Sequence, residues 1–388
     1  MFNRKFKLLV PITLALATGS AEVNATLYTS HGSLKNLTVF SNTYTTTGDA
    51  AIVYGNMLVG DVATTGANAG VTGNIDSVNA ANVGGGTSSV GGSVASGGVM
   101  TVGGAINATG PGPKITGSLT STGASTIGAY AQVLGNMLSG GIATTGANAI
   151  VGGSLQGATV VESASATSGS STTTATAVSA TLDTDLKTKA LAAAGEVSVI
   201  RGYLNSLTTP PANALAATMT IDTTLNAGVY SAASFSTTAS TILTLDAQGN
   251  DDAEFIFNIT DILAIGASTD IFIINQGAKN NAKVVWNTGG YASIGASADF
   301  IGTVFAKTYI SVGANSNVTS GSNACAGVYS QTSYVSTGAD ATINGTGCAT
   351  GVDKIDAELV SEPFGILLSG LAALGFVTRR KVRVARAS

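Results

Sequence analysis

Residues 141–155 read GIATTGANAIVGGSL, and residues 61–75 read DVATTGANAGVTGNI. The match extends over residues 51–75 and 131–155, with 16 identities in 25 aligned positions, which is more than composition alone supplies. A shorter unit recurs around both copies, as VTGNI at 71, VGGSV at 90, VGGAI at 102, ITGSL at 115 and VGGSL at 151. Three of the four intervals lie near multiples of about twelve residues, a period that favours the coils of a parallel β-solenoid over helical repeats or propeller blades.

Glycine is expected at the corners of such a coil. An aliphatic residue would point inward from each strand, and glycine would take positions where φ is positive or two backbones approach closely. The chain has 50 glycines among 388 residues. We interpret the recurring GAN, GAS and GAD triplets as corners; they begin at Gly66, Gly123, Gly146, Gly266, Gly295, Gly313 and Gly338.

One segment has the period of a helix instead. Between residues 174 and 207 the apolar residues are spaced by three or four, which predicts an amphipathic helix over about 175–207. Pro210 and Pro211 end it. Runs typical of strands return afterwards, as TILTL at 241–245, EFIFNI at 254–259, DIFIIN at 270–275, AKVVWN at 282–287 and FIGTVFA at 300–306. The predicted fold is all-β, a parallel β-solenoid with one long helix.

Both ends of the chain look like sorting signals. Basic residues, an apolar run and small residues in positions 1–25 predict a signal peptide for export. At the other end, Ser361, Glu362 and Pro363 precede an apolar stretch at 364–377 and a basic cluster that includes Arg379 and Arg380. That layout resembles the PEP-CTERM tail recognised by exosortases in Gram-negative bacteria, with serine in place of the first proline. It implies transient membrane insertion through 364–377, with an ordinary single-span anchor as the alternative.

Charge and cysteine content narrow the possible partners of the exported part. Residues 27–360 carry nine Lys and Arg against nineteen Asp and Glu, a net charge of −10, and this argues against nucleic acid as a partner. Cys325 and Cys348 are the only cysteines, and their even number in an exported chain favours a disulfide over free thiols. A metal site is not expected, because His31 is the only histidine and no other thiolate is available.

Several stretches carry a family resemblance in the same order: residues 131–155, the predicted helix, LNAGVYSAASF at 225–235, LTLDAQGN at 243–250 and the segment 284–318. Residues 130 to about 345 resemble the ice-binding-like domain of microbial antifreeze proteins. The resemblance implies a β-helix of triangular section with the helix packed along its side. Residues 47–128 would either lengthen this solenoid or form a second short one. The expected parts are a signal peptide at 1–25, a β-rich extension with a partial repeat at 26–129, the ice-binding-like domain at 130–348, a linker at 349–360 and the sorting tail at 361–388.

Ice binding by this family implies a flat face of short side chains. Threonine methyl and hydroxyl groups that repeat every 4.8 Å or so, the spacing of strands, can order water into an ice-like layer. The motif T-[A/G]-x-[T/N] occurs three times and has a near-match at Thr337, although composition alone supplies about three matches. The predicted ice-binding residues are Thr65, Asn68, Thr145, Asn148, Thr238, Thr241 and Thr337. One register step would exchange inward and outward positions.

Catalysis is not expected, and no cofactor is predicted. The single histidine excludes a Ser-His-Asp set and an HExxH motif, and no Walker-type loop follows any glycine. Acidic residues cluster around Asp246 and Glu254, where solvated turn carboxylates are favoured over a Ca²⁺ site. The leading hypothesis is therefore an exported protein, extracellular or on the outer surface of a Gram-negative bacterium, that adsorbs to ice. The alternative is a structural or adhesive protein of an exopolysaccharide matrix, and a polysaccharide-active enzyme ranks third.

Overall fold

A computed structural model describes residues 32–34, 36–105, 110–174, 178–179, 181–323 and 326–345. These residues form a parallel β-solenoid in which each coil contributes three short strands, so that the solenoid has three sides. Every strand pair in this part of the chain is parallel, and one thirteen-stranded sheet forms the first side while a twenty-four-stranded sheet covers the other two. The predicted fold class is confirmed. The predicted signal peptide, the sorting tail and both cysteines lie outside the described residues.

Side 1 is the thirteen-stranded sheet. Its strands are β2 (Thr45–Thr46), β5 (Val62–Thr64), β8 (Ala80–Val83), β11 (Val99–Val102), β14 (Ser125–Ile127), β17 (Ile142–Thr145), β19 (Thr159–Glu162), β21 (Thr218–Met219), β24 (Phe235–Thr237), β27 (Leu263–Ile265), β30 (Ala292–Ile294), β33 (Ile310–Val312) and β36 (Val335–Thr337).

Side 2 follows side 1 in each coil. Its strands are β3 (Ile52–Tyr54), β6 (Gly70–Val71), β9 (Ser89–Val90), β12 (Lys114–Ile115), β15 (Gln132–Val133), β22 (Thr223–Asn226), β25 (Ile242–Asp246), β28 (Asp270–Ile274), β31 (Asp299–Ile301), β34 (Asn317–Thr319) and β37 (Thr342–Asn344). Two long strands, β18 (Ile150–Gly157) and β20 (Thr167–Thr173), continue from side 2 onto side 3.

Side 3 faces the helix. Its strands are β1 (Leu37–Ser41), β4 (Asn56–Val59), β7 (Ile75–Ser77), β10 (Val94–Ser96), β13 (Leu119–Ser121), β16 (Met137–Ser139), β23 (Gly228–Ala232), β26 (Glu254–Ile259), β29 (Lys283–Thr288), β32 (Thr303–Ala306) and β35 (Gly327–Ser330). The helices are α1 (Leu182–Ser206) and two short 3-10 helices, η1 (Gly32–Leu34) and η2 (Pro211–Asn213).

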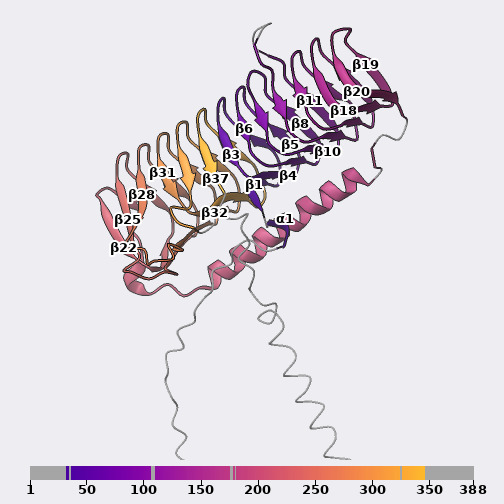
Figure 1. The fold of residues 1–388 in the computed structure, drawn as a ribbon. Helices are drawn as coiled ribbons and strands as arrows, with labels where there is room; N and C mark the ends of the chain where they lie inside the picture. The colour runs from indigo at the N-terminus through magenta and orange to yellow at the C-terminus, as the bar shows by residue number, and fades with distance from the viewer. Residues whose placement is uncertain are drawn as a thin grey trace, which may run out of the picture. The chain divides into compact units, whose positions relative to one another are not determined.

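The chain enters the solenoid in its middle. β1 pairs with β4 on one side and with β35, near the C-terminal end of the described chain, on the other. From this seam the first coils run to one end at β20, α1 returns alongside, and the remaining coils run from β21 back to the seam (Figure 1). The strands of residues 37–127 and 132–344 share the same sheets, so the repeated N-terminal segment lengthens one solenoid.

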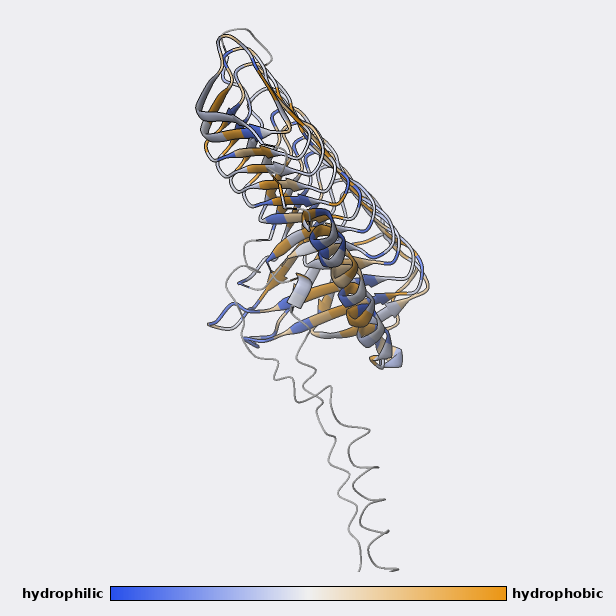
Figure 2. Cartoon of the chain, turned by 90° about the vertical axis from the view of Figure 1, so that its right-hand side faces the viewer, coloured by the Kyte–Doolittle hydropathy of each residue, from blue (hydrophilic) through white to orange (hydrophobic). Residues whose placement is uncertain are grey.

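Apolar side chains from all three sides fill the interior. One hydrophobic cluster runs along the solenoid, with mainly Val, Ile, Met and Ala in the N-terminal coils and aromatic residues in the C-terminal coils. Trp286 is fully buried, and its ring stacks on Phe257 with centroids 3.9 Å apart. Figure 2 shows apolar residues recurring along the strands and α1 lying beside the coils. The inward aliphatic residues expected from the repeats supply this core.

The helix α1 packs on side 3 through one apolar face. Leu186, Ala190, Ala193, Val197, Ile200 and Leu204 are buried, as their three- and four-residue spacing predicts. Two polar contacts add to this packing, because Glu196 accepts hydrogen bonds from the backbone of Ser33 and Leu34 at 2.7 and 3.0 Å. The helix begins at Leu182, later than about residue 175, because Ser179 and Thr181 use their hydroxyls locally and form a turn instead.

Candidate functional site

The outward-pointing residues of side 1 form a continuous middle file of short side chains. Each strand contributes one such residue, and the strand register aligns it with its neighbours; Thr64, for example, lies opposite both Thr46 and Asn82. In the eleven strands between the two end strands, the residues on either side of the outward residue are buried, so this file points outward. In spatial order it reads Thr218, Ser236, Ala264, Ser293, Ser311, Ser336, Thr46, Thr64, Asn82, Thr101, Thr126, Thr144 and Val161.

Two more outward files flank the middle file. The preceding file consists of the residues two positions before each middle-file residue, and it contains Ala, Ser, Thr, Val, Ile and Tyr. The glycine file consists of the residues two positions after each middle-file residue, and ten of its thirteen positions are glycine. None of the three files contains Asp, Glu, Lys or Arg. Twelve strand spacings of about 4.8 Å make this uncharged surface roughly 58 Å long.

The glycine file is required by the close approach of neighbouring coils. A Cβ built on Gly66 would lie 2.5 Å from the carbonyl carbon of Gly48, and one on Gly295 would lie 2.5 Å from the backbone nitrogen of Ala267. Positive φ falls elsewhere in the triplets, on Asn68 (58°) and Asn148 (55°). The GAN triplets are therefore corners, with glycine allowing the approach and asparagine adopting the left-handed backbone.

Four tyrosines stack along the preceding file of side 1. Tyr291, Tyr309, Tyr334 and Tyr44 come from successive coils, with ring centroids 4.6, 5.0 and 4.6 Å apart and planes within 9° of parallel. The Tyr334–Tyr44 contact crosses the seam between the last and first coils. Burial, and then the neighbouring tyrosines, raise the pKa of Tyr309 above its usual value.

Four of the predicted ice-binding residues point into the solenoid. Thr65, Thr145, Thr241 and Thr337 are buried, so their prediction as outward residues is wrong. Three of their hydroxyls accept a backbone N–H from the adjacent coil, as Thr65 does from Gly84 at 2.9 Å, and Thr241 bonds to its own turn at Thr238. These hydroxyls satisfy corner donors that would otherwise be buried without a partner.

The other three predicted residues are exposed at corners. Asn68 and Asn148 lie four positions beyond the middle file, at the turn from side 1 to side 2, and Thr238 lies at one end of the glycine file. The outward residues that sequence reasoning missed include Thr64 and Thr144, each immediately before a predicted threonine. The alternation of apolar Ala63 and Ala143 with the threonines could have identified them. If the alanines point into the core, the next residues, Thr64 and Thr144, must point outward.

The other two sides differ from side 1. Side 2 carries outward charges, among them Lys114, Asp270 and Asp299, and Asp270 lies directly opposite Asp299. Side 3 is covered in part by α1, where Arg201 donates hydrogen bonds to Gln331 at 2.5 Å and to the Thr288 carbonyl at 2.8 Å. Burial lowers the pKa of this arginine. Apart from exposed Glu162 at the end of β19, side 1 is thus the uncharged side of the described solenoid.

The acidic residues around the turn at 246–254 are engaged in local contacts. Asp246 accepts a hydrogen bond from Asn275 at 2.9 Å, and Asp251 accepts one from the backbone of Lys279 at 2.6 Å. A hydrogen bond from Asn281 and the charge of Lys279 lower the pKa of Asp252. Within the described ranges no group of three or more His, Cys, Asp or Glu side chains could hold a metal ion.

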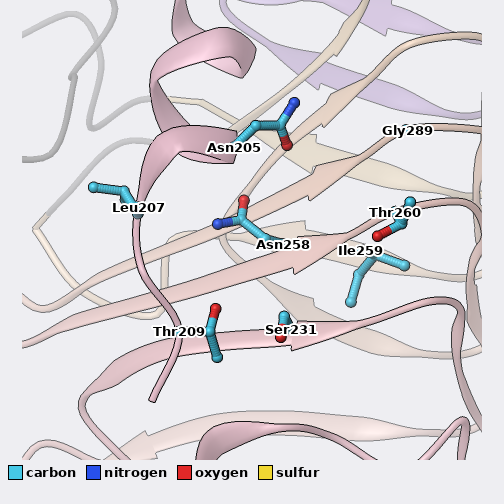
Figure 3. A pocket seen from close by; sticks show the side chains of 8 residues that line it. All are labelled: Asn205, Leu207, Thr209, Ser231, Asn258, Ile259, Thr260 and Gly289. Atoms are coloured by element: carbon cyan, nitrogen blue, oxygen red, sulfur yellow. The ribbon is translucent and has the colours of Figure 1, made fainter. Parts of the chain in front are cut away.

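A cavity of about 350 Å³ lies between the C-terminal end of α1 and side 3. It is lined by Asn205, Leu207, Thr209, Ser231, Asn258, Ile259, Thr260 and Gly289. The amides of Asn205 and Asn258 point toward one another (Figure 3), and Asn287 donates to both at 2.7 and 3.0 Å. This amide network joins the helix to the sheet.

Among the described residues, none of the helices has the length and hydropathy needed to cross a membrane.

Comparison with known proteins gives consistent matches. The family described as ice-binding-like matches residues 117–342. Ice-binding protein 1 of Shewanella frigidimarina is 40% identical over 97 residues, 25% of this chain and 11% of that protein. The ice-binding protein of Nostoc sp. is 31% identical over 163 residues, 41% of this chain and 56% of that protein. The chain therefore spans about a tenth and about half of the lengths of these relatives. The crystal structure of an ice-binding protein from Antarctomyces psychrotrophicus has 16% identity and a TM-score of 0.40, covering 81% of this chain and 96% of that one.

Proposed function

Because the chain belongs to the ice-binding-like family, we propose that the protein adsorbs to ice through side 1 of its solenoid. One observation carries the choice of side. Three adjoining outward files on side 1 contain no charged residue over thirteen strands, whereas side 2 has outward charges and side 3 is partly covered by α1. Adsorption of this kind needs no catalytic group, and we propose that the protein is not an enzyme.

The proposed adsorption follows from the periodicity of the sheet. Parallel strands repeat every 4.8 Å or so, and each coil presents a short side chain at the same height above the sheet. Threonine offers a methyl group and a hydroxyl at a position that β-branching restricts. A flat array of such groups can hold a layer of ordered water that joins the ice lattice. A long charged side chain would disturb this layer because it keeps its own hydration shell.

The wider setting of the protein is also a proposal. The N-terminal sequence supports export, and the C-terminal sequence supports processing by an exosortase-like enzyme at the outer surface of a Gram-negative bacterium. Contact with an exopolysaccharide matrix would follow from that location. These proposals rest on residues 1–25 and 361–388, and mass spectrometry of the mature protein would test whether both segments are removed.

A matched pair of substitutions in one coil tests the proposed function. Asn82 lies in the middle file of side 1, and Ser89 points outward from side 2 of the same coil. We expect the unmodified protein and Ser89→Lys to inhibit ice recrystallisation at micromolar concentration, and Asn82→Lys to lose most of that inhibition. Lack of inhibition by the unmodified protein would exclude ice adsorption, and equal inhibition by both variants would exclude side 1.

A further inference from the structure

Side 1 is not uniform along its length, and we infer that ice contact is centred on five consecutive coils between residues 62 and 146. This inference rests on the proposed function. The five strands are β5, β8, β11, β14 and β17, and the four-tyrosine stack marks the boundary of this contact region. The middle file there reads Thr64, Asn82, Thr101, Thr126 and Thr144.

The chemistry of the middle file changes at the seam. On the C-terminal half it carries serine at β24, β30, β33 and β36 and alanine at β27. Serine presents a hydroxyl without a methyl group and alanine a methyl group without a hydroxyl, whereas threonine presents both. The threonine χ1 angle is also restricted by its branched Cβ, so its two groups stay in register from coil to coil. Threonine occupies four of the five middle-file positions in the five coils, with Asn82 as the exception, whereas the middle file of the C-terminal half has one threonine, Thr218.

The preceding file changes at the same place. In the five coils it contains Val62, Ala80, Val99, Ala124 and Ile142, all of them short aliphatic side chains. In the four coils next to them it contains the stacked tyrosines. A phenol ring is larger than an alanine or valine side chain, so a row of four rings interrupts the even height of short residues. On the other side of the stack only three coils follow, with Ile262, Ser234 and Ala216 in this file, so the five coils are the longer stretch of short side chains.

Exposure favours the centre of the five-coil region. Thr101 and Thr126 are exposed, whereas Ser293 and Ser311, and also Thr64, Asn82 and Thr144, are half-buried. Val99 and Ile142 have 52% and 48% of their surface exposed, so aliphatic groups also reach solvent in the five coils. Exposed aliphatic and threonine side chains therefore lie side by side in the adjacent strands β11 and β14 and at Ile142 in β17.

The five coils lie partly outside the family match. Residues 62–103, which hold three of the five strands, lie before the family match at 117–342. The first and last of the five coils belong to the duplicated segments 51–75 and 131–155, and Thr64 and Thr144 are equivalent positions in the two copies. Four spacings of about 4.8 Å separate these threonines, so the array spans about 19 Å.

Two double substitutions of equal size test this assignment. Thr101→Tyr with Thr126→Tyr alters adjacent coils of the five-coil region, and Ser293→Tyr with Ser311→Tyr alters adjacent coils beside the tyrosine stack. We expect the first variant to need about tenfold more protein for the same recrystallisation inhibition, and the second, which alters side 1 outside the five-coil region, to need less than about threefold more. Thermal unfolding would verify that both variants fold.

A smaller pair of changes covers the case in which a tyrosine variant fails to fold. Thr101→Ser with Thr126→Ser removes only two exposed methyl groups, and we expect several-fold weaker inhibition. Unchanged inhibition by these serine substitutions would overturn the inference. Equal loss in both tyrosine variants would also overturn it while leaving adsorption through side 1 in place. If no substitution on side 1 has an effect, the inference and the proposed surface both fail.

Discussion

At the scale of residues, the repeated Thr-Thr-Gly-Ala-Asn-Ala sequence places two adjacent threonines in opposite roles. Thr64 points outward in the middle file of side 1, and Thr65 points inward and accepts a hydrogen bond from the backbone of Gly84. The sequence predicted a corner at this motif and a threonine face beside it. It assigned the face to the wrong threonine, because the motif does not show which of the two adjacent threonines points inward. A shift of one residue exchanges the two faces of a strand.

Substitution of each threonine by valine would separate these roles. Thr65→Val keeps the volume but removes a buried acceptor, so we expect the free energy of unfolding to fall by about 1–3 kcal/mol. Thr64→Val alters a partly exposed position whose hydroxyl forms no hydrogen bond with the described residues, and we expect a change within about 0.5 kcal/mol. Urea unfolding of both variants measures the difference. Equal destabilisation would contradict the assigned orientation.

The tyrosine stack predicts a response to alkaline pH. The pKa of Tyr309 is raised from 10.0, so its neutral form is favoured in the folded protein. The contribution of this group to stability is full below pH 10 and is lost as the pH rises through the folded-state pKa. We expect the melting temperature of the unmodified protein to fall more steeply above pH 10 than that of Tyr309→Phe, which keeps the ring but cannot ionise. Parallel pH profiles would contradict a raised pKa at this position.

At the scale of elements, local periodicity was sufficient to locate the helix and most of the strands that the sequence analysis named. The three- and four-residue spacing identified the buried face of α1, and EFIFNI at 254–259 is β26. The run FIGTVFA at 300–306 is divided between β31 and β32, because Gly302 adopts a φ of 115° where the chain turns from side 2 to side 3. A continuous apolar run does not reveal such a corner when both of the strands that flank it are buried.

Two valines of α1 provide a matched test of its packing. Val197 is fully buried against the solenoid, whereas Val199 has 63% of its surface exposed. Val197→Ala should lower the free energy of unfolding by about 2 kcal/mol, through lost burial and the remaining cavity. Val199→Ala should change it by less than about 0.5 kcal/mol. Chemical unfolding monitored by circular dichroism compares them, and similar effects would show that α1 is not packed through this face.

At the scale of the whole molecule, the path of the chain could not be predicted from the sequence. The first coil lies between two others because β1 pairs with both β4 and β35. The residues of β1 and β35 are almost 300 positions apart in the sequence. The inward residues of β1 are apolar, like those of every other coil, so nothing in residues 37–41 identifies β35 as the distant partner. The repeat did indicate coils of one kind, and residues 37–127 prove to extend the same sheets. The number of strands that each outward file crosses, and hence the length of side 1, depends on that closure.

Retention of fluorescently labelled protein on ice tests the central claim, adsorption through side 1. Thr144 and Ile150 point outward from sides 1 and 2 of the same coil, so Thr144→Tyr and Ile150→Tyr place the same ring on the two sides. Fluorescently labelled proteins would be exposed to a slowly growing ice crystal, and the label retained on ice would be measured. The unmodified protein and Ile150→Tyr should remain on the ice, and Thr144→Tyr should be retained much less. Exclusion of the unmodified protein from ice, or equal retention of all three proteins, would contradict adsorption through side 1.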